Sequence, residues 1–420
     1  MTVRSADRGA VLALDDYFPT ETTGFRIAEF SYLLGHDVVD EVLTTIDALD
    51  EKRDRFRERY PELADRVVQF TPAALQSADL AYINFVNNAH YFLPFLEQSL
   101  TPFVLALYPG GGLALDDSAS LAKLDAVMAS PLLREVISTQ PLVTEFLASK
   151  HPRVPVTEIY GVPVNADYFV PGAATRTNYP HERADVHRIC FVAHKYTPGG
   201  VDKGLDLFVD CIRILHEAGL NVVATVVGPW QPDDLGEHAG LPITVVPSIP
   251  STELRAFFLT QHLHISPNRP GVLASGAFDG FPLTTSVEAA LSGVGLVVTD
   301  ELHQNRVLVD GRDAIIEKPD AAAIAARILS LVAHPNALES MARAGLRRLR
   351  ASHSPEQQLA RRAQDDEDSV STVDRIADDA TVQGVAHHGV DLIGEIAEPL
   401  RGAHQCGHGV AAPDRAPRQQ

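Results

Sequence analysis

Short runs of apolar residues alternate along the chain with longer segments in which apolar residues recur at helical spacing. Residues 10–16, AVLALDD, form the first apolar run, and residues 25–35, FRIAEFSYLLG, follow with a helical pattern. The same order returns at residues 79–100 and again from residue 188. Short buried strands that alternate with amphipathic helices are typical of parallel β-sheets. The pattern predicts an α/β protein with doubly wound sheets, which bind ligands at the carboxyl ends of their strands.

A polar, loop-like stretch interrupts this pattern once, at residues 173–188. We therefore predict an N-terminal domain of residues 1–172 and a second domain of residues 173–364. From about residue 365 the sequence becomes polar, and we expect residues 365–420 to form a largely disordered tail.

Composition excludes several classes of protein. The chain has 420 residues, 45% of them hydrophobic and 21% charged, which suits two globular domains with an extension. The formal net charge of -20, without clustered Lys and Arg, argues against a nucleic-acid partner but not against a nucleotide ligand.

The three cysteines, Cys190, Cys211 and Cys406, form no CxxC motif, which indicates a reducing compartment. No signal peptide and no apolar span of about 18 residues is recognised, so we predict a cytoplasmic protein. Peripheral contact with the inner face of the plasma membrane stays open.

The most informative stretch is residues 278–300, FDGFPLTTSVEAALSGVGLVVTD. It opens with Asp279 in a Gly-Phe-Pro turn and continues through Thr284, Thr285 and Ser286, which are good helix N-cap types. The expected helix carries Glu288 and is followed by an apolar strand. A helix N-terminus behind such a turn presents unpaired N–H groups, so the stretch predicts a site for a phosphate or diphosphate flanked by two carboxylates.

These residues resemble the C-terminal half of retaining glycosyltransferases of the GT-B fold, the group called family 4. Asp279 stands where that family usually has its first Glu, and Glu288 matches the second. The two are nine positions apart, where the common family pattern has eight. The resemblance covers residues 188–350 well and residues 10–172 mainly by the order of elements. It implies two Rossmann-like domains facing across a cleft, with residues 354–364 crossing back to brace the first.

The resemblance also assigns residues to the donor. Lys203 with Gly204 matches the family's Lys-Gly pair, which holds the donor diphosphate, and Lys195 replaces the usual Arg as a point charge. Without the resemblance, the simplest interpretation of Lys195 and Lys203 would be two surface lysines in a loop. Ser248 lies in the loop that receives the base in the family, and Gly24 lies in the N-terminal loop near the donor phosphate and the acceptor. The donor-binding residues implied are Lys195, Lys203, Gly204, Gly280, Phe281, Pro282, Leu283, Glu288 and Ser248.

The implied reaction is the transfer of a hexose or deoxyhexose from a nucleotide diphosphate sugar to an acceptor hydroxyl, with retention at the anomeric carbon, in polysaccharide or glycoconjugate assembly. Asp279 and Glu288 would bind sugar and ribose hydroxyls. His90 could orient or deprotonate the acceptor, or be an ordinary polar residue of a helix end. The acceptor would be a glycan, a lipid-linked molecule or a small molecule.

We expect neither a cofactor nor a metal. Asp366 and Asp368 form a DxD pattern, but they lie in the polar tail. Two other readings remain open. One is another GT-B reaction, such as that of a sugar-nucleotide epimerase or a phosphorylase. The other is a catalytically degenerate binding or scaffold protein, which the shortened Asp279 and the altered spacing would explain.

Overall fold

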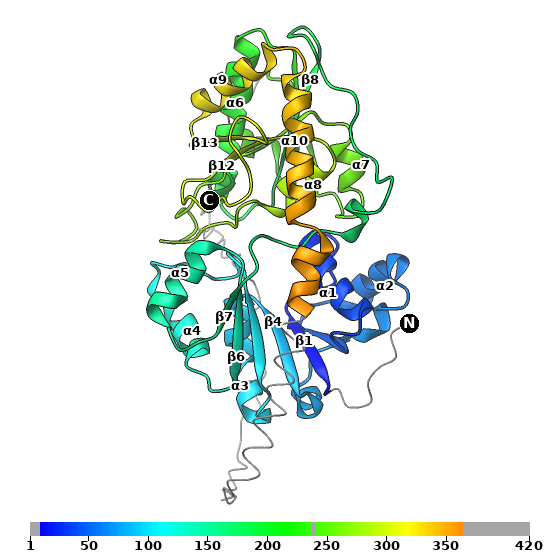
Figure 1. Cartoon of the computed structure of the whole chain (residues 1–420), viewed down its shortest axis with the longest axis vertical. Coiled ribbons are helices and arrows are strands. Elements are labelled where there is room, and N and C mark those ends of the chain that lie inside the picture. The colour runs from blue at the N-terminus through cyan, green and yellow to red at the C-terminus, as the bar shows by residue number, and fades with distance from the viewer. Residues whose placement is uncertain (1–8, 237–239, 364–420) are drawn as a thin grey trace, which may run out of the picture.

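The computed structural model describes residues 9–236 and 240–363, which form two domains, each built on one parallel β-sheet (Figure 1). The strands are β1 (Val11–Asp15), β2 (Glu41–Thr44), β3 (Val67–Gln69), β4 (Leu80–Asn84), β5 (Phe103–Leu107), β6 (Leu133–Ser138), β7 (Val156–Glu158), β8 (His187–Val192), β9 (Val222–Val227), β10 (Ile243–Val246), β11 (Leu263–Ser266), β12 (Gly295–Thr299) and β13 (Ile315–Glu317).

The sheets have the orders β3-β2-β1-β4-β5-β6-β7 and β10-β9-β8-β11-β12-β13. In each sheet the strand order reverses beside the first strand of the domain, β1 or β8. This reversal is the switch point at which doubly wound folds bind ligands. The predicted architecture of two doubly wound parallel sheets is confirmed.

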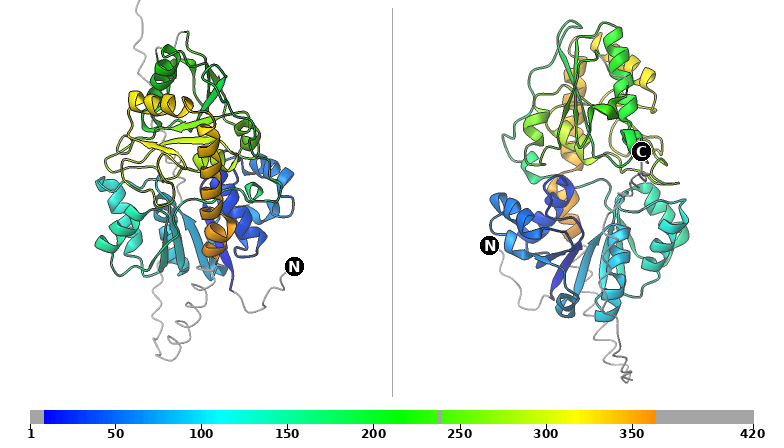
Figure 2. Two further views of the ribbon diagram at one scale, coloured as in Figure 1. Left: turned by 45° about the horizontal axis from the view of Figure 1, so that its top comes forward. Right: turned by 180° about the vertical axis from the view of Figure 1, so that it is seen from behind.

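Helices cover both faces of each sheet (Figure 2). The α-helices are α1 (Gly24–Gly35), α2 (Leu49–Arg59), α3 (Val86–Ser99), α4 (Ser118–Met128), α5 (Pro141–Lys150), α6 (Leu205–Glu217), α7 (Leu254–Phe258), α8 (Thr284–Leu291), α9 (Ala321–Val332) and α10 (Ala337–Ser352). In the C-terminal domain, α6 and α9 pack together on one face of the sheet, and α8 and α10 pack on the other.

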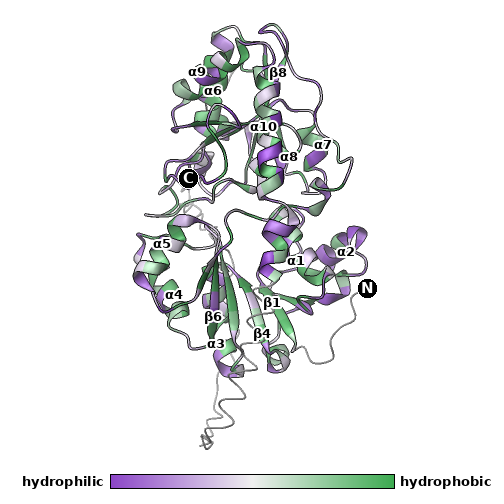
Figure 3. Cartoon of the chain, viewed as in Figure 1, coloured by the Kyte–Doolittle hydropathy of each residue, from purple (hydrophilic) through white to green (hydrophobic). Residues whose placement is uncertain are grey.

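Burial explains the apolar runs in the sequence. Every residue of the strands β1, β4, β5 and β12 is buried, because helices cover the sheets on both faces. Hydrophobic residues accordingly gather in the strands, whereas the outer helix α2 is hydrophilic for most of its length (Figure 3).

The end of the described chain returns to the N-terminal domain. A short π-helix (Glu356–Ala360) follows α10 and packs against α1. Beyond it, the side chain of Arg362 is fully buried, with its Nε 3.2 Å from Oε1 of Glu29. Glu29 also accepts hydrogen bonds from the Tyr82 hydroxyl, 2.6 Å away, and the Asn84 amide, 2.9 Å away. The structure thus places residues 354–363 as a brace across the two domains.

Within the described residues, no single helix is long and apolar enough to cross a membrane, although α9 and the helical segment 337–363 pass that test jointly, with a bend of 107° between them. The predicted disordered tail, with Asp366, Asp368 and Cys406, lies outside the described residues.

Candidate active site

Lys203 and Asp279 form an ion pair at the carboxyl edge of the C-terminal sheet. Lys203 ends a short 3-10 helix (Pro198–Lys203), and its Nζ lies 2.6 and 2.7 Å from the two carboxylate oxygens of Asp279. Gly204 follows with φ 72°, and a Cβ there would lie 2.1 Å from the carbonyl oxygen of Pro267, so only glycine fits. The backbone at Gly204 thus packs against Pro267, next to the Lys203 that contacts Asp279.

Charge balance keeps the Lys203 ammonium protonated. Burial works to lower its pKa, but the negative charge of Asp279 and the Tyr196 hydroxyl raise it above the ordinary value. The Tyr196 ring also lies beneath the ammonium, with its centroid 4.9 Å from Nζ. Lys203 therefore carries a positive charge at neutral pH although only 7% of its surface is exposed.

Asn268 fixes the other side of Asp279. Its Nδ2 donates a 2.5 Å hydrogen bond to Oδ2 of Asp279, and its backbone oxygen accepts a 2.6 Å bond from the Thr299 hydroxyl. Asn268 follows β11 and Thr299 ends β12, so two neighbouring strands orient the carboxylate. A cavity adjoins this cluster and is also lined by Pro282 and Ser286.

The loop from Gly280 to Leu283 leads into α8. It contains a cis peptide bond between Phe281 and Pro282. Leu283 occupies the N-cap position and its side chain makes no capping bond, whereas Thr284, Thr285 and Ser286 lie inside the helix. The expectation that these three residues cap the helix is therefore wrong. No side chain among the described residues caps α8, and its first turn can offer N–H groups to an anion.

Glu288 lies deeper in α8, at the junction of the two domains. Only 1% of its surface is exposed, and its Oε1 has no hydrogen-bond partner among the described residues. A Cβ built on Gly24 would lie 3.0 Å from that oxygen and 3.3 Å from Cβ of Ser251. Burial raises the pKa of Glu288 to about 8. The unpartnered Oε1 of Glu288 thus faces the start of α1, where Gly24 has no side chain.

Two other predicted donor residues take no part in the Lys203–Asp279 pair. Lys195 pairs with Asp234, with 2.6 Å between Nζ and Oδ1, and does not contact Asp279. Ser248 is exposed in the loop after β10.

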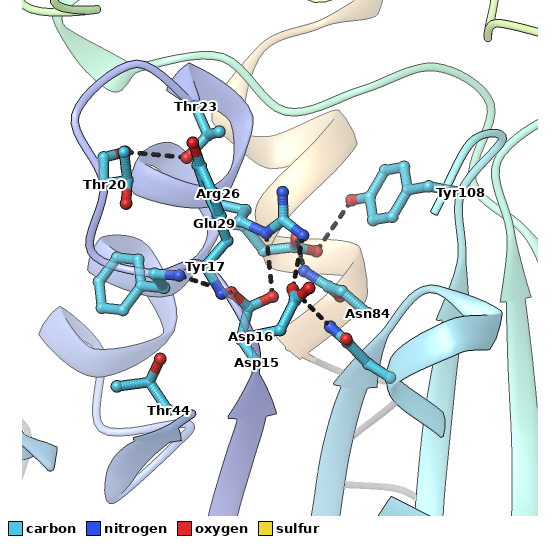
Figure 4. Close-up of polar contacts among 12 residues, drawn as sticks. Asp15, Asp16, Tyr17, Thr20, Thr23, Arg26, Glu29, Thr44, Asn84 and Tyr108 are labelled. Atoms are coloured by element: carbon cyan, nitrogen blue, oxygen red, sulfur yellow. Dashed lines mark hydrogen bonds and ion pairs between the residues drawn. The ribbon is translucent and has the colours of Figure 1, made fainter. Parts of the chain in front are cut away.

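A second polar cluster lies at the end of β1 in the N-terminal domain. Figure 4 shows Arg26 beside Asp15 and Asp16, with Glu29 and Tyr108 close by. The Arg26 guanidinium lies 3.0 Å from each of the two aspartates, and Asn88 donates a 3.1 Å hydrogen bond to Asp16. Burial raises the pKa of Asp15, and the charge of Arg26 does not offset this rise. Two carboxylates thus share one guanidinium in this cluster.

Tyr196 connects the two clusters across the domains. Burial raises the pKa of its hydroxyl, and the charges of Lys203, Asp279 and Arg26 also act on that pKa. Charged groups of both domains therefore lie near Tyr196.

Solved structures share the architecture of this chain. Anabaena HepE in complex with UDP and glucose has a TM-score of 0.62 at 12% identity, over 89% of this chain and 100% of that one. A glycosyltransferase from Rickettsia africae ESF-5 has a TM-score of 0.61 at 13% identity, over 87% of this chain and 99% of that one. Sucrose-phosphate synthase from Thermosynechococcus elongatus has a TM-score of 0.57 at 13% identity, over 89% and 100%. These neighbours establish the GT-B fold.

Sequence comparison adds the class of enzyme. No curated protein sequence matches the chain. Residues 207–364 match the model of a family described as glycosyl transferase-like, and this region contains Asp279, α8 and Glu288. The chain thus has a GT-B fold, and its residues 207–364 are glycosyl transferase-like. The predicted resemblance and the predicted enzyme class are confirmed.

Asn88 rather than His90 reaches the N-terminal cluster. His90 lies on the exposed side of α3, whereas Asn88 is buried two residues earlier and contacts Asp16. Sequence reasoning also missed Tyr196, Asn268 and Ser251. The one sequence feature that these residues share is their position in a loop that follows a strand. Tyr196 follows β8, Asn268 follows β11 and Ser251 follows β10. No group of three or more metal-ligating side chains occurs within the described part of the chain.

Proposed function

We propose that this glycosyltransferase moves a sugar from a nucleotide diphosphate donor to an acceptor hydroxyl, with retention at the anomeric carbon. The observation that carries the proposal is the Lys203–Asp279 pair beside the uncapped start of α8. In this assignment Lys203 and the first-turn N–H groups bind the diphosphate, and Asp279 binds hydroxyls of the transferred sugar. Glu288 accepts hydrogen bonds from the ribose.

The chemistry needs stabilisation of the leaving group. The bond between the anomeric carbon and the phosphate oxygen breaks, which leaves an oxocarbenium-like sugar and a diphosphate of growing negative charge. The fixed positive charge of Lys203 and the end of the α8 dipole stabilise that charge. The acceptor oxygen then bonds to the anomeric carbon from the same face, and its proton passes to the departing phosphate oxygen.

We place the acceptor against the N-terminal cluster, because Arg26 of this cluster and Lys203 both act on the pKa of Tyr196. Two carboxylates, Asp15 and Asp16, surround the single positive charge of Arg26, so the cluster offers no attraction to an acceptor phosphate. Carboxylate and amide groups suit hydroxyls. We therefore expect an uncharged, polyhydroxylated acceptor terminus. A role in polysaccharide or glycoconjugate assembly and a cytoplasmic location stay predictions.

The test is product analysis. UDP-hexoses are the first donors to try, because the HepE structures contain UDP and UDP-glucose. The purified enzyme is given each donor with glycan acceptors, nucleotide release is followed, and the anomeric configuration of the product is read by NMR. Acceptor-dependent release of nucleotide with a retained anomer supports the proposal. Conversion of the donor sugar without acceptor would favour an epimerase, use of phosphate as acceptor would favour a phosphorylase, and an inverted product would refute retention.

A further inference from the structure

Gln140 of the N-terminal domain binds the loop of residues 276–283, which carries Asp279 and which we call the donor loop. The side-chain Oε1 of Gln140 accepts a 3.1 Å hydrogen bond from the Phe281 N–H, and its Nε2 donates a 3.2 Å bond to the Phe281 carbonyl. Both groups of one residue of the donor loop are thus bound by one side chain of the opposite domain. Gln140 is only 2% exposed, so water does not compete for these bonds.

Gln140 itself is held firmly. It immediately precedes α5, which begins at Pro141 and lies on the side of the N-terminal domain that meets the C-terminal domain (Figure 1). Its backbone carbonyl accepts hydrogen bonds from the hydroxyls of Ser138 and Thr144. The amide therefore projects from a fixed point of the first domain.

A second contact holds the other end of the same loop. The Leu115 N–H donates a 3.0 Å hydrogen bond to the Gly276 carbonyl, and Ala114 forms an antiparallel bridge with Ala277. Asp279 lies between these contacts and the contact with Gln140. The N-terminal domain thus fixes the backbone on both sides of the carboxylate that pairs with Lys203.

We propose that Gln140 is a positioning residue for the nucleotide-sugar donor. By holding the Phe281 peptide, it sets the direction of Asp279 and of the start of α8, so that the donor site is complete only when the two domains are docked. This inference rests on the proposed function, because it concerns the donor assigned to that site. Since the Phe281 N–H is occupied by Gln140, the donor must bind through Lys203, Asp279 and the first turn of α8.

The chain offers a matched control in Gln358. This residue is also 2% exposed, and its Nε2 donates a 2.8 Å hydrogen bond to the Tyr160 carbonyl. Gln358 therefore joins the brace of residues 354–363 to the N-terminal domain and does not bind the Phe281 peptide. Gln140→Met and Gln358→Met each remove one buried amide of the same size. Only the first removes the hydrogen bonds to Phe281.

The experiment compares wild type, Gln140→Met and Gln358→Met in two measurements. Hydrogen exchange of the free proteins should be faster at residues 276–283 in Gln140→Met only. With the nucleotide sugar that the wild type uses, Gln140→Met should raise the donor KM at least about tenfold, and Gln358→Met should change it less than about threefold.

Three outcomes would overturn the inference. Equal losses of donor binding in both Met variants would mean that Gln140 merely joins the domains. Unchanged exchange and KM in Gln140→Met would mean that the loop holds its own shape, and the proposed function would survive this result. A folded wild type that binds no nucleotide sugar, even with normal exchange differences among the variants, would instead defeat the proposed function together with the inference.

Discussion

The carboxylate of Asp279 lies between the ammonium of Lys203, 2.6 Å away, and the amide of Asn268, 2.5 Å away. The three side chains come from separate loops at one edge of the C-terminal sheet. Asp279 therefore reaches the basic residue although it is one methylene shorter than the Glu usual in related enzymes. The shorter side chain fits this sheet edge and does not by itself indicate a degenerate site.

This packing predicts that Asp279→Glu lowers activity. An added methylene cannot keep the contacts with both Lys203 and Asn268, so we expect kcat/KM for the nucleotide sugar to fall about tenfold or more, or about 1.4 kcal/mol. Steady-state kinetics measures the change, with Asp279→Asn as the variant that keeps the length but removes the charge. Activity in Asp279→Glu above that of the wild type would show that the site is built for the longer residue.

Gly24→Ala should damage the site from the opposite domain. The new Cβ would lie 3.0 Å from Oε1 of Glu288, which is tighter than an ordinary contact. We expect nucleotide affinity, measured by calorimetry, to fall about tenfold. Gly35→Ala in the same helix is the matched control, since a Cβ there meets no atom within 4 Å. If the two variants bind nucleotide alike, the close approach of Gly24 to Glu288 has no role in binding.

Glu288 should make stability depend on pH. Its pKa is raised by burial from an ordinary 4.5 to about 8, so between these values the folded protein holds a proton that the unfolded chain has lost. The stabilising effect of this proton is fully present below pH 4.5 and is lost as the pH rises toward 8. Between pH 4.5 and 8, the free energy of unfolding should decline more steeply with pH in wild type than in Glu288→Gln. The difference between the two slopes should be up to about 1.4 kcal/mol per pH unit. Urea unfolding at pH 5.5 and 7.5 measures the difference. Equal slopes for the two proteins would show that Glu288 is ionised in the folded state.

Arg362→Met tests the brace between the domains. Removing the guanidinium leaves Glu29 buried without its ionic partner, and breaking such a pair costs about 3–5 kcal/mol. Chemical denaturation should show this loss, whereas Arg361→Met, at an exposed neighbouring position, should stay within about 0.5 kcal/mol of wild type. A small effect of Arg362→Met would mean that residues 354–363 add little to the docking of the domains.

Much of the fold could be predicted from the sequence, because its causes are local. The strands β1 and β12 are apolar throughout since both of their faces are covered, and α6 has a clear apolar side. Burial on one or two faces leaves a periodic pattern that the sequence displays directly.

The partners of the polar side chains could not be predicted in this way. Lys203 and Asp279 are 76 positions apart, and Gln140 and Phe281 are 141 apart. A polar residue in a loop has no periodicity that reveals which distant loop it will meet. Resemblance to a family supplied Lys203, Asp279 and Glu288, but it could not supply Gln140 or Asn268. The start of α8 was misjudged because Thr284–Ser286 have cap-forming side chains, yet Leu283 takes the cap position.

The most direct test of the donor site is a calorimetric titration of wild type, Lys203→Met and Lys195→Met with UDP, GDP, dTDP and ADP sugars in the absence of metal. We predict that wild type binds the sugars of one base, that Lys203→Met binds them at least about tenfold more weakly, and that Lys195→Met, whose lysine is paired with Asp234, stays within about threefold of wild type. No binding by a folded wild type, or equal affinity in Lys203→Met and wild type, would contradict the assignment of a nucleotide-sugar site to Lys203 and Asp279.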